Sequence, residues 1–396
     1  MKPRRWVSLI FSALAVTLFT SFTLQAGVNQ VDEAAQQLLD AGAAGISMAM
    51  INSNGMTWSG ARGFADLERK QLISIDTVMN IASISKTVTA TSLMLLVEQG
   101  KLALDQDINS YLPIKVVNTQ HPGETITTRQ LLTHTSAIID RGDLYFSKIS
   151  YYPRTDNPFP LGEFLQAYLS PNGQFYQARN FASYPPGMQR QYSNIGFGLA
   201  GYLVEVLSGV PLNRFSAEHI FKPLGMDATG WMLTEIDPQQ HAMLYEWNGE
   251  EQIPVEWYGL VTWPDGGMRT SVRDLARFFA AMIGGGQFQG KRILQTSTVE
   301  GMFTPQFSSG QVLAGVEDEE NHQQALAWSY RSGNSARITL GHGGGDPGVA
   351  TAAHFFPGAG VGAILLVNTS SEKDGFGQAF ENLIRALMNT AIEGTE

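Results

Sequence analysis

The chain contains no cysteine. This absence excludes disulfide bonds, thiolate metal sites, a cysteine nucleophile and a lipid anchor attached to cysteine. The seven histidines show neither H-E-x-x-H nor H-x-H spacing, so we expect no metal site. No motif indicates a cofactor. An excess of positive charge is also missing, because the formal net charge is −10 and both signs are scattered along the chain; we therefore expect no nucleic-acid partner.

The N-terminus has the layout of a secretory signal. Lys2, Arg4 and Arg5 precede an apolar run over residues 6–22, and a possible cleavage site ends at Ala26. We expect residues 1–26 to be a signal peptide, and a periplasmic or secreted protein follows from this. An uncleaved segment, which would anchor the protein to a membrane, stays open as an alternative.

Strand patterns at both ends of the chain enclose a helical middle. Hydrophobic residues make up 43% of the 396 residues, enough for a large core. Apolar or alternating runs cover 46–52, 56–61, 324–331, 337–342, 350–357 and 361–368, and a helix is expected over 375–392. We therefore predict an α+β fold, in which helices flank one antiparallel sheet built from both chain ends. The expected catalytic domain is 27–396, with an α/β part at about 27–104 and 265–396 and a helical part at about 105–264.

A serine and a lysine stand at the start of an otherwise apolar helical stretch, "NIASISKTVTATSLMLLVEQGKL", which begins at Asn80. Ser83 and Lys86 are three residues apart and therefore share one helical face. A serine is a poor nucleophile until a neighbouring base removes its proton, and a partly neutral lysine can do this. The alternative is a serine cap beside a surface lysine. A second S-x-x-K at 370–373 lies in polar chain, and we interpret it as a solvated loop.

Two further motifs follow. Tyr192-Ser193-Asn194 precedes a helical pattern, and residues two apart in extended chain point the same way, so the phenol and the amide can enter one cavity. His342-Gly343-Gly344 is expected at a strand end, where backbone without side chains lets a substrate lie close. The structural alternatives are a capping Asn beside a half-buried Tyr, and a strand that turns through its glycines.

The order S-x-x-K, Y-x-N and H-x-G resembles that of the serine β-lactamase and penicillin-binding-protein superfamily. The Y-x-N form is similar to class C β-lactamases, to the related D-alanyl-D-alanine carboxypeptidases and transpeptidases, and to their esterase relatives. The segments "WSGARGFADLE", "ITTRQLLTHTSAI", "YSNIGFGLAGYLVE" and "DGGMRTSVRDLARFF" also resemble that family, so the likeness covers nearly all of 27–396.

The resemblance implies a role for each motif. Ser83 would attack a carbonyl, and Lys86 with Tyr192 would transfer its proton. Asn194 would orient the lysine and bind a substrate amide. The other implied roles are substrate binding by His342 and Gly344, and an oxyanion hole formed by the backbone N–H groups of Ser83 and Gly345.

Two departures from the family pattern bear on the substrate. His342 replaces the lysine of class C β-lactamases, and Gly343 replaces the hydroxyl residue that commonly follows it, so a substrate carboxylate would lose a cation and a donor. This favours peptidase or esterase chemistry over an efficient β-lactamase. Ala137 stands where relatives usually have Gly, and we expect this to affect only a loop.

Two classes of function remain. The first is an exported serine hydrolase that acts through an acyl-serine on a small-molecule or peptide substrate, either a D-Ala-type peptide, a small ester or a β-lactam. The second is a non-catalytic module on the same fold that binds peptidoglycan or a protein. An unrelated α/β-hydrolase is disfavoured because no G-x-S-x-G occurs. The sequence carries no indication of the oligomeric state.

Overall fold

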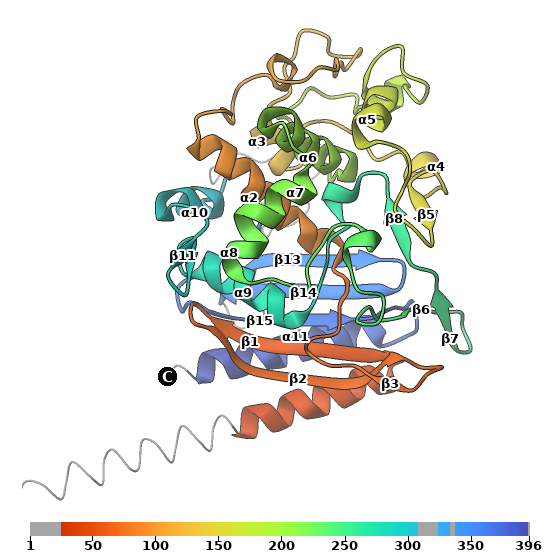
Figure 1. Ribbon diagram of the computed structural model, residues 1–396, viewed down its shortest axis with the longest axis vertical. Coiled ribbons are helices and arrows are strands. Elements are labelled where there is room, and N and C mark those ends of the chain that lie inside the picture. The colour runs from red at the N-terminus through yellow and green to blue at the C-terminus, as the bar shows by residue number, and fades with distance from the viewer. Residues whose placement is uncertain (1–24, 308–323, 333–336, 395–396) are drawn as a thin grey trace, which may run out of the picture.

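A seven-stranded antiparallel sheet forms the centre of the protein (Figure 1). The computed structural model describes residues 25–307, 324–332 and 337–394, so residues 1–24 of the expected signal peptide lie outside the described residues. The strand order is β12-β13-β14-β15-β1-β2-β3, in which chain ends far apart in sequence pair through β15 and β1. The strands are β1 (Gly45–Asn52), β2 (Gly55–Asp66), β3 (Gln71–Leu72), β12 (Ser329–Ser332), β13 (Ile338–Asp346), β14 (Val349–Phe356) and β15 (Val361–Val367).

Both faces of the sheet are buried, because side chains alternate between two cores. In β1, Ile46 and Met48 belong to the core between the sheet and two helices, the helix over 25–40 and α11 (Phe376–Glu393). Ala49 and Ile51 face the core on the opposite side of the sheet. In Figure 1 the helix over 25–40 lies below the sheet, α11 overlaps β15 and β1 in the view, and most of the remaining helices lie above the sheet. The α+β arrangement expected from the sequence is confirmed.

The helical region lies mostly between the two halves of the sheet in sequence. Its helices, together with those that flank it, are α2 (Ser85–Glu98), α3 (Thr128–Leu132), α4 (Gly142–Tyr145), α5 (Leu161–Leu169), α6 (Asn194–Ser208), α7 (Leu212–Ser216), α8 (Lys222–Leu224), α9 (Val272–Ile283) and α10 (Thr296–Phe303). Short strands complete it: β4 (Met79–Asn80), β5 (Tyr151–Pro153), β6 (Leu244–Trp247), β7 (Gln252–Val255), β8 (Tyr258–Leu260), β9 (Arg269–Thr270), β10 (Gln287–Phe288), β11 (Lys291–Arg292) and β16 (Thr369–Ser370).

The helices of the described residues differ in length and hydropathy. No single one is both long and apolar enough to cross a bilayer. The helix Asn194–Ser208 and the stretch Leu212–Leu224, taken together, pass by length and composition, with a bend of 75° between them.

One strand prediction is wrong over most of its length. The alternating run 324–331 forms a strand only from Ser329, because a tight turn precedes it. Ala327 has a φ of 64°, and the Gln324 side-chain amide donates hydrogen bonds to the carbonyls of Ala325 and Trp328. Trp328 is fully buried, so alternating hydrophobicity here reflects a packed turn.

Glycines let α6 pack directly against the segment that precedes β9. A Cβ atom at Gly198 would lie 3.0 Å from the Thr262 Cβ, and one at Gly201 would lie 2.3 Å from the Pro264 Cβ. A larger residue at either position would force the two segments apart. This close approach places the carbonyl of Asp265 next to the start of α2 and α6.

Candidate active site

Ser83 lies in a single 3-10 turn, η1 (Ala82–Ile84), just before α2. The sequence predicts one continuous helix here, and the structure divides it. Ala82 has a φ of 47°, in the left-handed region, and its N–H donates a 2.6 Å hydrogen bond to the Asn80 side-chain oxygen. This conformation is costly for a residue with a Cβ atom, and the Asn80 bond stabilises it. The turn presents Ser83 to a cleft.

Lys86 is fully buried at the first turn of α2. Its ammonium nitrogen donates three hydrogen bonds: 2.9 Å to Ser83 Oγ, 2.7 Å to Asn194 Oδ1 and 2.8 Å to the Asp265 carbonyl oxygen. An ammonium group has three N–H donors, so each donor of this side chain has one partner. Within the described part of the chain Lys86 forms no ion pair with a carboxylate, and the three bonds hold the nitrogen within proton-transfer distance of the serine.

Tyr192 also contacts the serine. Its hydroxyl donates a 2.9 Å hydrogen bond to Ser83 Oγ. The His134 ring stacks on the phenol ring at 4.1 Å between centroids, and Lys86 Nζ lies 4.9 Å from the phenol centroid. Burial lowers the pKa of His134 well below 6.5, and its Nδ1 accepts a hydrogen bond from the Ser193 N–H. The His134 ring is therefore neutral, and its stacking contact holds the tyrosine ring in place.

The N-terminus of α6 carries Asn194 and is capped by a carboxylate distant in sequence. Asp140 accepts hydrogen bonds from the Asn194 N–H (2.7 Å), the Ile195 N–H (2.9 Å) and the Ser193 hydroxyl (3.1 Å). Free N–H groups at a helix start favour such an anion. Burial raises the pKa of Asp140, and these three bonds oppose the increase. The cap fixes the orientation in which Asn194 meets Lys86.

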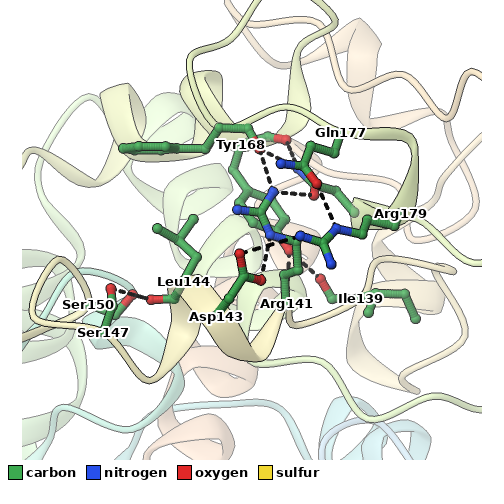
Figure 2. Close-up of polar contacts among 11 residues, drawn as sticks. Ile139, Arg141, Asp143, Leu144, Ser147, Ser150, Tyr168, Gln177 and Arg179 are labelled. Carbon is green, nitrogen blue, oxygen red and sulfur yellow. Dashed lines mark hydrogen bonds and ion pairs between the residues drawn. The ribbon is translucent and has the colours of Figure 1, made fainter.

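A buried tyrosine hydroxyl holds the backbone on either side of Asp140. Figure 2 shows Tyr168, whose hydroxyl donates to the Ile139 carbonyl at 2.7 Å and accepts from the Arg141 N–H at 3.0 Å. The Arg141 guanidinium pairs with Asp143 at 2.8 Å, and Arg179 approaches the other carboxylate oxygen at 3.5 Å. Tyr168 thus connects α5 to the segment that caps α6.

The third motif lies along one edge of the cleft. His342, Gly344 and Gly345 line a cleft of about 750 Å³ that Ser83 and Tyr192 also line. The sequence places the glycines at a strand end, but β13 continues through them to Asp346. Gly344 is required by close approach, since a Cβ there would lie 2.6 Å from the Ile81 carbonyl oxygen. The strand therefore lies against η1, next to the serine.

Two histidines at this edge are uncharged. Burial is the main cause that lowers the pKa of His342 to about 3 and that of His354 to about 3. The His342 Nδ1 lies 2.5 Å from the Gly343 carbonyl oxygen, an arrangement that places a proton on this nitrogen. At the first position of the third motif, the cleft of this protein therefore presents a neutral imidazole.

Buried acids also surround the lysine. Burial raises the pKa of Asp265 to about 7, against the positive charge of Lys86, and raises the pKa of Asp346 to about 6. The hydroxyl of Tyr145 donates to Asp265 at 3.2 Å, and that of Tyr151 donates to Asp346 at 2.6 Å. Asp265 contacts the lysine nitrogen through its backbone carbonyl oxygen and not through its carboxylate.

The structure brings together Ser83, Lys86, Tyr192 and Asn194 through direct hydrogen bonds. Ser370 of the second S-x-x-K lies elsewhere, in β16, where its hydroxyl accepts a bond from the Gly348 N–H. Sequence reasoning missed other contributors to the site, namely Asn80, His134, Asp140, Tyr168 and Asp265. Three of these residues lie within segments that the sequence analysis singled out: Asn80 begins the stretch that carries Ser83, His134 lies in "ITTRQLLTHTSAI", and Asp265 begins "DGGMRTSVRDLARFF".

The arrangement places two groups beside the nucleophile, Lys86 and Tyr192, and either can take up the serine proton once it has lost its own. Both lie at 2.9 Å from the serine oxygen, which is the range needed for general acid–base catalysis. A metal would need a cluster of acids or imidazoles. Within residues 25–307, 324–332 and 337–394, no group of three or more such side chains could hold one.

Known proteins of similar sequence and structure support the family resemblance. A family model described as Beta-lactamase matches residues 31–387, which confirms the resemblance carried by the motifs. Among curated proteins, penicillin-binding protein 4* of Bacillus subtilis is 25% identical over 306 residues, a stretch that covers 73% of this chain and 60% of that protein. The chain thus spans about three fifths of the length of this relative.

Solved structures share the fold. The D-amino acid amidase of Ochrobactrum anthropi, solved with L-phenylalanine amide, superimposes with a TM-score of 0.70 at 22% identity, covering 92% of this chain and 99% of the amidase. A β-lactamase/D-alanine carboxypeptidase of Pseudomonas syringae gives a TM-score of 0.67 at 21% identity, with 91% and 99% covered. At these identities the likeness shows the fold alone, and it confirms the β-lactamase/transpeptidase-like fold.

Replacing Tyr168 with Phe should loosen the support of the site. The change removes the hydrogen bonds to the half-buried carbonyl of Ile139 and the half-buried N–H of Arg141, so we expect the free energy of unfolding to fall by about 1–3 kcal/mol. Denaturant titration measures this. The exposed Tyr152, changed to Phe, serves as the matched control and should behave as wild type. Equal stability of the two variants would contradict the role given to the Tyr168 hydroxyl.

Proposed function

Because the chain belongs to the Beta-lactamase family, we propose that it is a serine hydrolase that cleaves amide or ester bonds through an acyl-enzyme on Ser83. One observation supports this above the others: Lys86 Nζ and the Tyr192 hydroxyl each lie 2.9 Å from Ser83 Oγ. A site that only bound ligand would not require two proton-transfer groups on one hydroxyl.

In the proposed reaction, Ser83 Oγ forms a bond to the substrate carbonyl carbon. Its proton passes to whichever of Lys86 and Tyr192 is deprotonated, and that proton then moves to the leaving nitrogen or oxygen as its bond to carbon breaks. Water attacks the resulting ester on Ser83 by the same route and regenerates the serine. The backbone N–H groups of Ser83 and Gly345 stabilise the oxyanion, a role supported by the position of β13 against η1.

Asn194, His342 and Gly344 complete the proposed site. Asn194 holds the lysine nitrogen through the 2.7 Å bond and offers its amide to the substrate. Gly344 lets β13 lie directly against η1, so that its backbone borders the cleft beside Ser83 and can bind substrate there, and the neutral His342 positions the substrate or its leaving group. Because no lysine stands at the His342 position, we favour a D-Ala-type peptide or a small ester as substrate over a β-lactam. The amidase and carboxypeptidase with this fold support testing D-configured amides first.

Labelling tests the nucleophile. Wild-type protein incubated with a fluorophosphonate or benzylpenicillin should gain one adduct by intact-mass spectrometry, and Ser83→Ala should gain none. Ser370→Ala, which alters the other S-x-x-K, is the matched control and should label as wild type. Full labelling of Ser83→Ala would exclude this serine, and no labelling of a well-folded wild type would favour a non-catalytic module that binds peptidoglycan or a protein.

Turnover tests the proton-transfer role of Tyr192. Tyr192→Phe keeps the ring that stacks on His134 and removes only the hydroxyl. We expect kcat on p-nitrophenyl esters to fall by about 10²-fold or more, the usual effect of losing a general acid or base. Tyr176→Phe, which removes a hydroxyl bonded to Val117 and Thr119 instead, provides the control. A wild-type kcat for Tyr192→Phe would remove this residue from the mechanism.

We also propose that the protein is exported, from the basic residues and the apolar run within 1–26. Expression of the full chain in a Gram-negative host, followed by osmotic shock, should release a form shortened at about Ala26. Recovery in the membrane fraction at full mass would indicate an uncleaved anchor. Retention in the cytoplasm would contradict export.

A further inference from the structure

The cleft beside Ser83 is basic although the protein as a whole is acidic. Among the described residues that line it, four are arginines and one is acidic; these are Arg190, Arg331, Arg337, Arg385 and Glu381. The complete chain has a formal net charge of −10. A concentration of one sign in a concave surface raises the local concentration of ligands of the opposite sign. The charge distribution therefore indicates an anionic ligand.

Among the described residues that line the cleft, the positive charge comes from guanidinium groups. His342 and His354, which also line the cleft, are neutral because burial lowers the pKa of each to about 3. Lys86 lies beneath Ser83 and directs its three N–H donors to protein oxygens. Within the described part of the cleft lining, a cation available to pair with an anionic ligand is therefore an arginine.

Arg190 is the arginine placed closest in sequence to the reacting groups, two residues before Tyr192. Its side chain is half-buried, and its Nε donates a 3.2 Å hydrogen bond to the uncharged side-chain oxygen of Gln324. It takes part in none of the ion pairs formed within the described part of the chain. Since burying a cation without an anion is unfavourable, an arriving carboxylate would be stabilised here.

We propose that Arg190 binds a free carboxylate of the substrate, so that the cleft selects anionic esters or amides over their neutral analogues. The planar guanidinium presents two parallel N–H donors, which match the two oxygens of a carboxylate. Arg190 would thereby supply the cation that the neutral His342 cannot. This inference rests on the proposed hydrolase function and names its substrate class.

Matched substrate pairs test the proposal. The first pair is mono-p-nitrophenyl succinate and its methyl ester, which differ in one charge on the acyl side. The second is an N-acyl-D-Ala-D-Ala peptide and its C-terminal amide, which differ on the leaving-group side. We expect wild type to favour the anionic member of at least one pair. Arg190→Gln should lower the ratio of kcat/KM, anionic over neutral, by about 10- to 100-fold through KM, the effect of losing a charged hydrogen bond.

Two further variants separate contact from general charge. Arg190→Lys keeps the cation without the paired donors and should retain part of the ratio. Arg385→Gln removes an equal charge from an exposed position on α11 in the same cleft and should change the ratio much less. Equal effects of Arg385→Gln and Arg190→Gln, or an unchanged ratio in Arg190→Gln, would overturn the proposal. Thermal unfolding of each variant checks that it is folded.

A binding measurement keeps this test independent of catalysis. In the Ser83→Ala background, calorimetric titration with N-acetyl-D-alanine and with its amide should show tighter binding of the acid, and Arg190→Gln should abolish that preference. A wild type that binds the acid but is neither labelled nor active would contradict the hydrolase function and leave the carboxylate site standing. Equal binding of acid and amide, together with an unchanged substrate ratio, would refute the carboxylate site alone.

Discussion

A lysine ammonium group with no contact to water must have an oxygen for each of its protons, and much of this structure serves that requirement. Lys86 obtains its three oxygens from parts of the chain that are unrelated in sequence: the serine one turn earlier, the side chain of Asn194 and the carbonyl of Asp265. Loss of any one would leave a buried charged donor unpaired, which is among the most destabilising changes a protein interior can undergo.

Each of these three oxygens is positioned by a different structural feature. Asn194 is oriented by the carboxylate of Asp140 at the start of α6, and Asp140 is positioned in turn by the hydroxyl of Tyr168. The Asp265 carbonyl comes within reach because the glycines of α6 allow direct packing on its segment. The serine is presented by a strained turn that Asn80 stabilises. Rigid secondary structure and buried polar contacts therefore set the geometry before any substrate arrives.

The parts of the site that the sequence predicts are those set by local spacing. Ser83 and Lys86 are three residues apart on a helix and therefore share one face. Tyr192 and Asn194 are two residues apart in extended chain, so their side chains point the same way. Hydrophobic alternation likewise predicts most strands of the sheet. Contacts between distant segments leave no such pattern, which is why Asp140 and Arg190 could not be assigned roles from the sequence. Ala137, expected to affect only a loop, has a φ of 61°, a left-handed conformation that glycine would adopt more readily.

The sequence separations in the site have a consequence for folding. The reactive serine and its lysine are neighbours in the chain, but the lysine meets Asn194 across 108 residues and Asp265 across 179. The sheet beside them joins β1 to β15, from opposite ends of the chain. Contacts this distant form late and slowly, because a long loop must close before each one is made. Assembly of the full set of lysine partners is thus coupled to the completion of folding, and an incompletely folded chain holds the serine and lysine without the surroundings that align them.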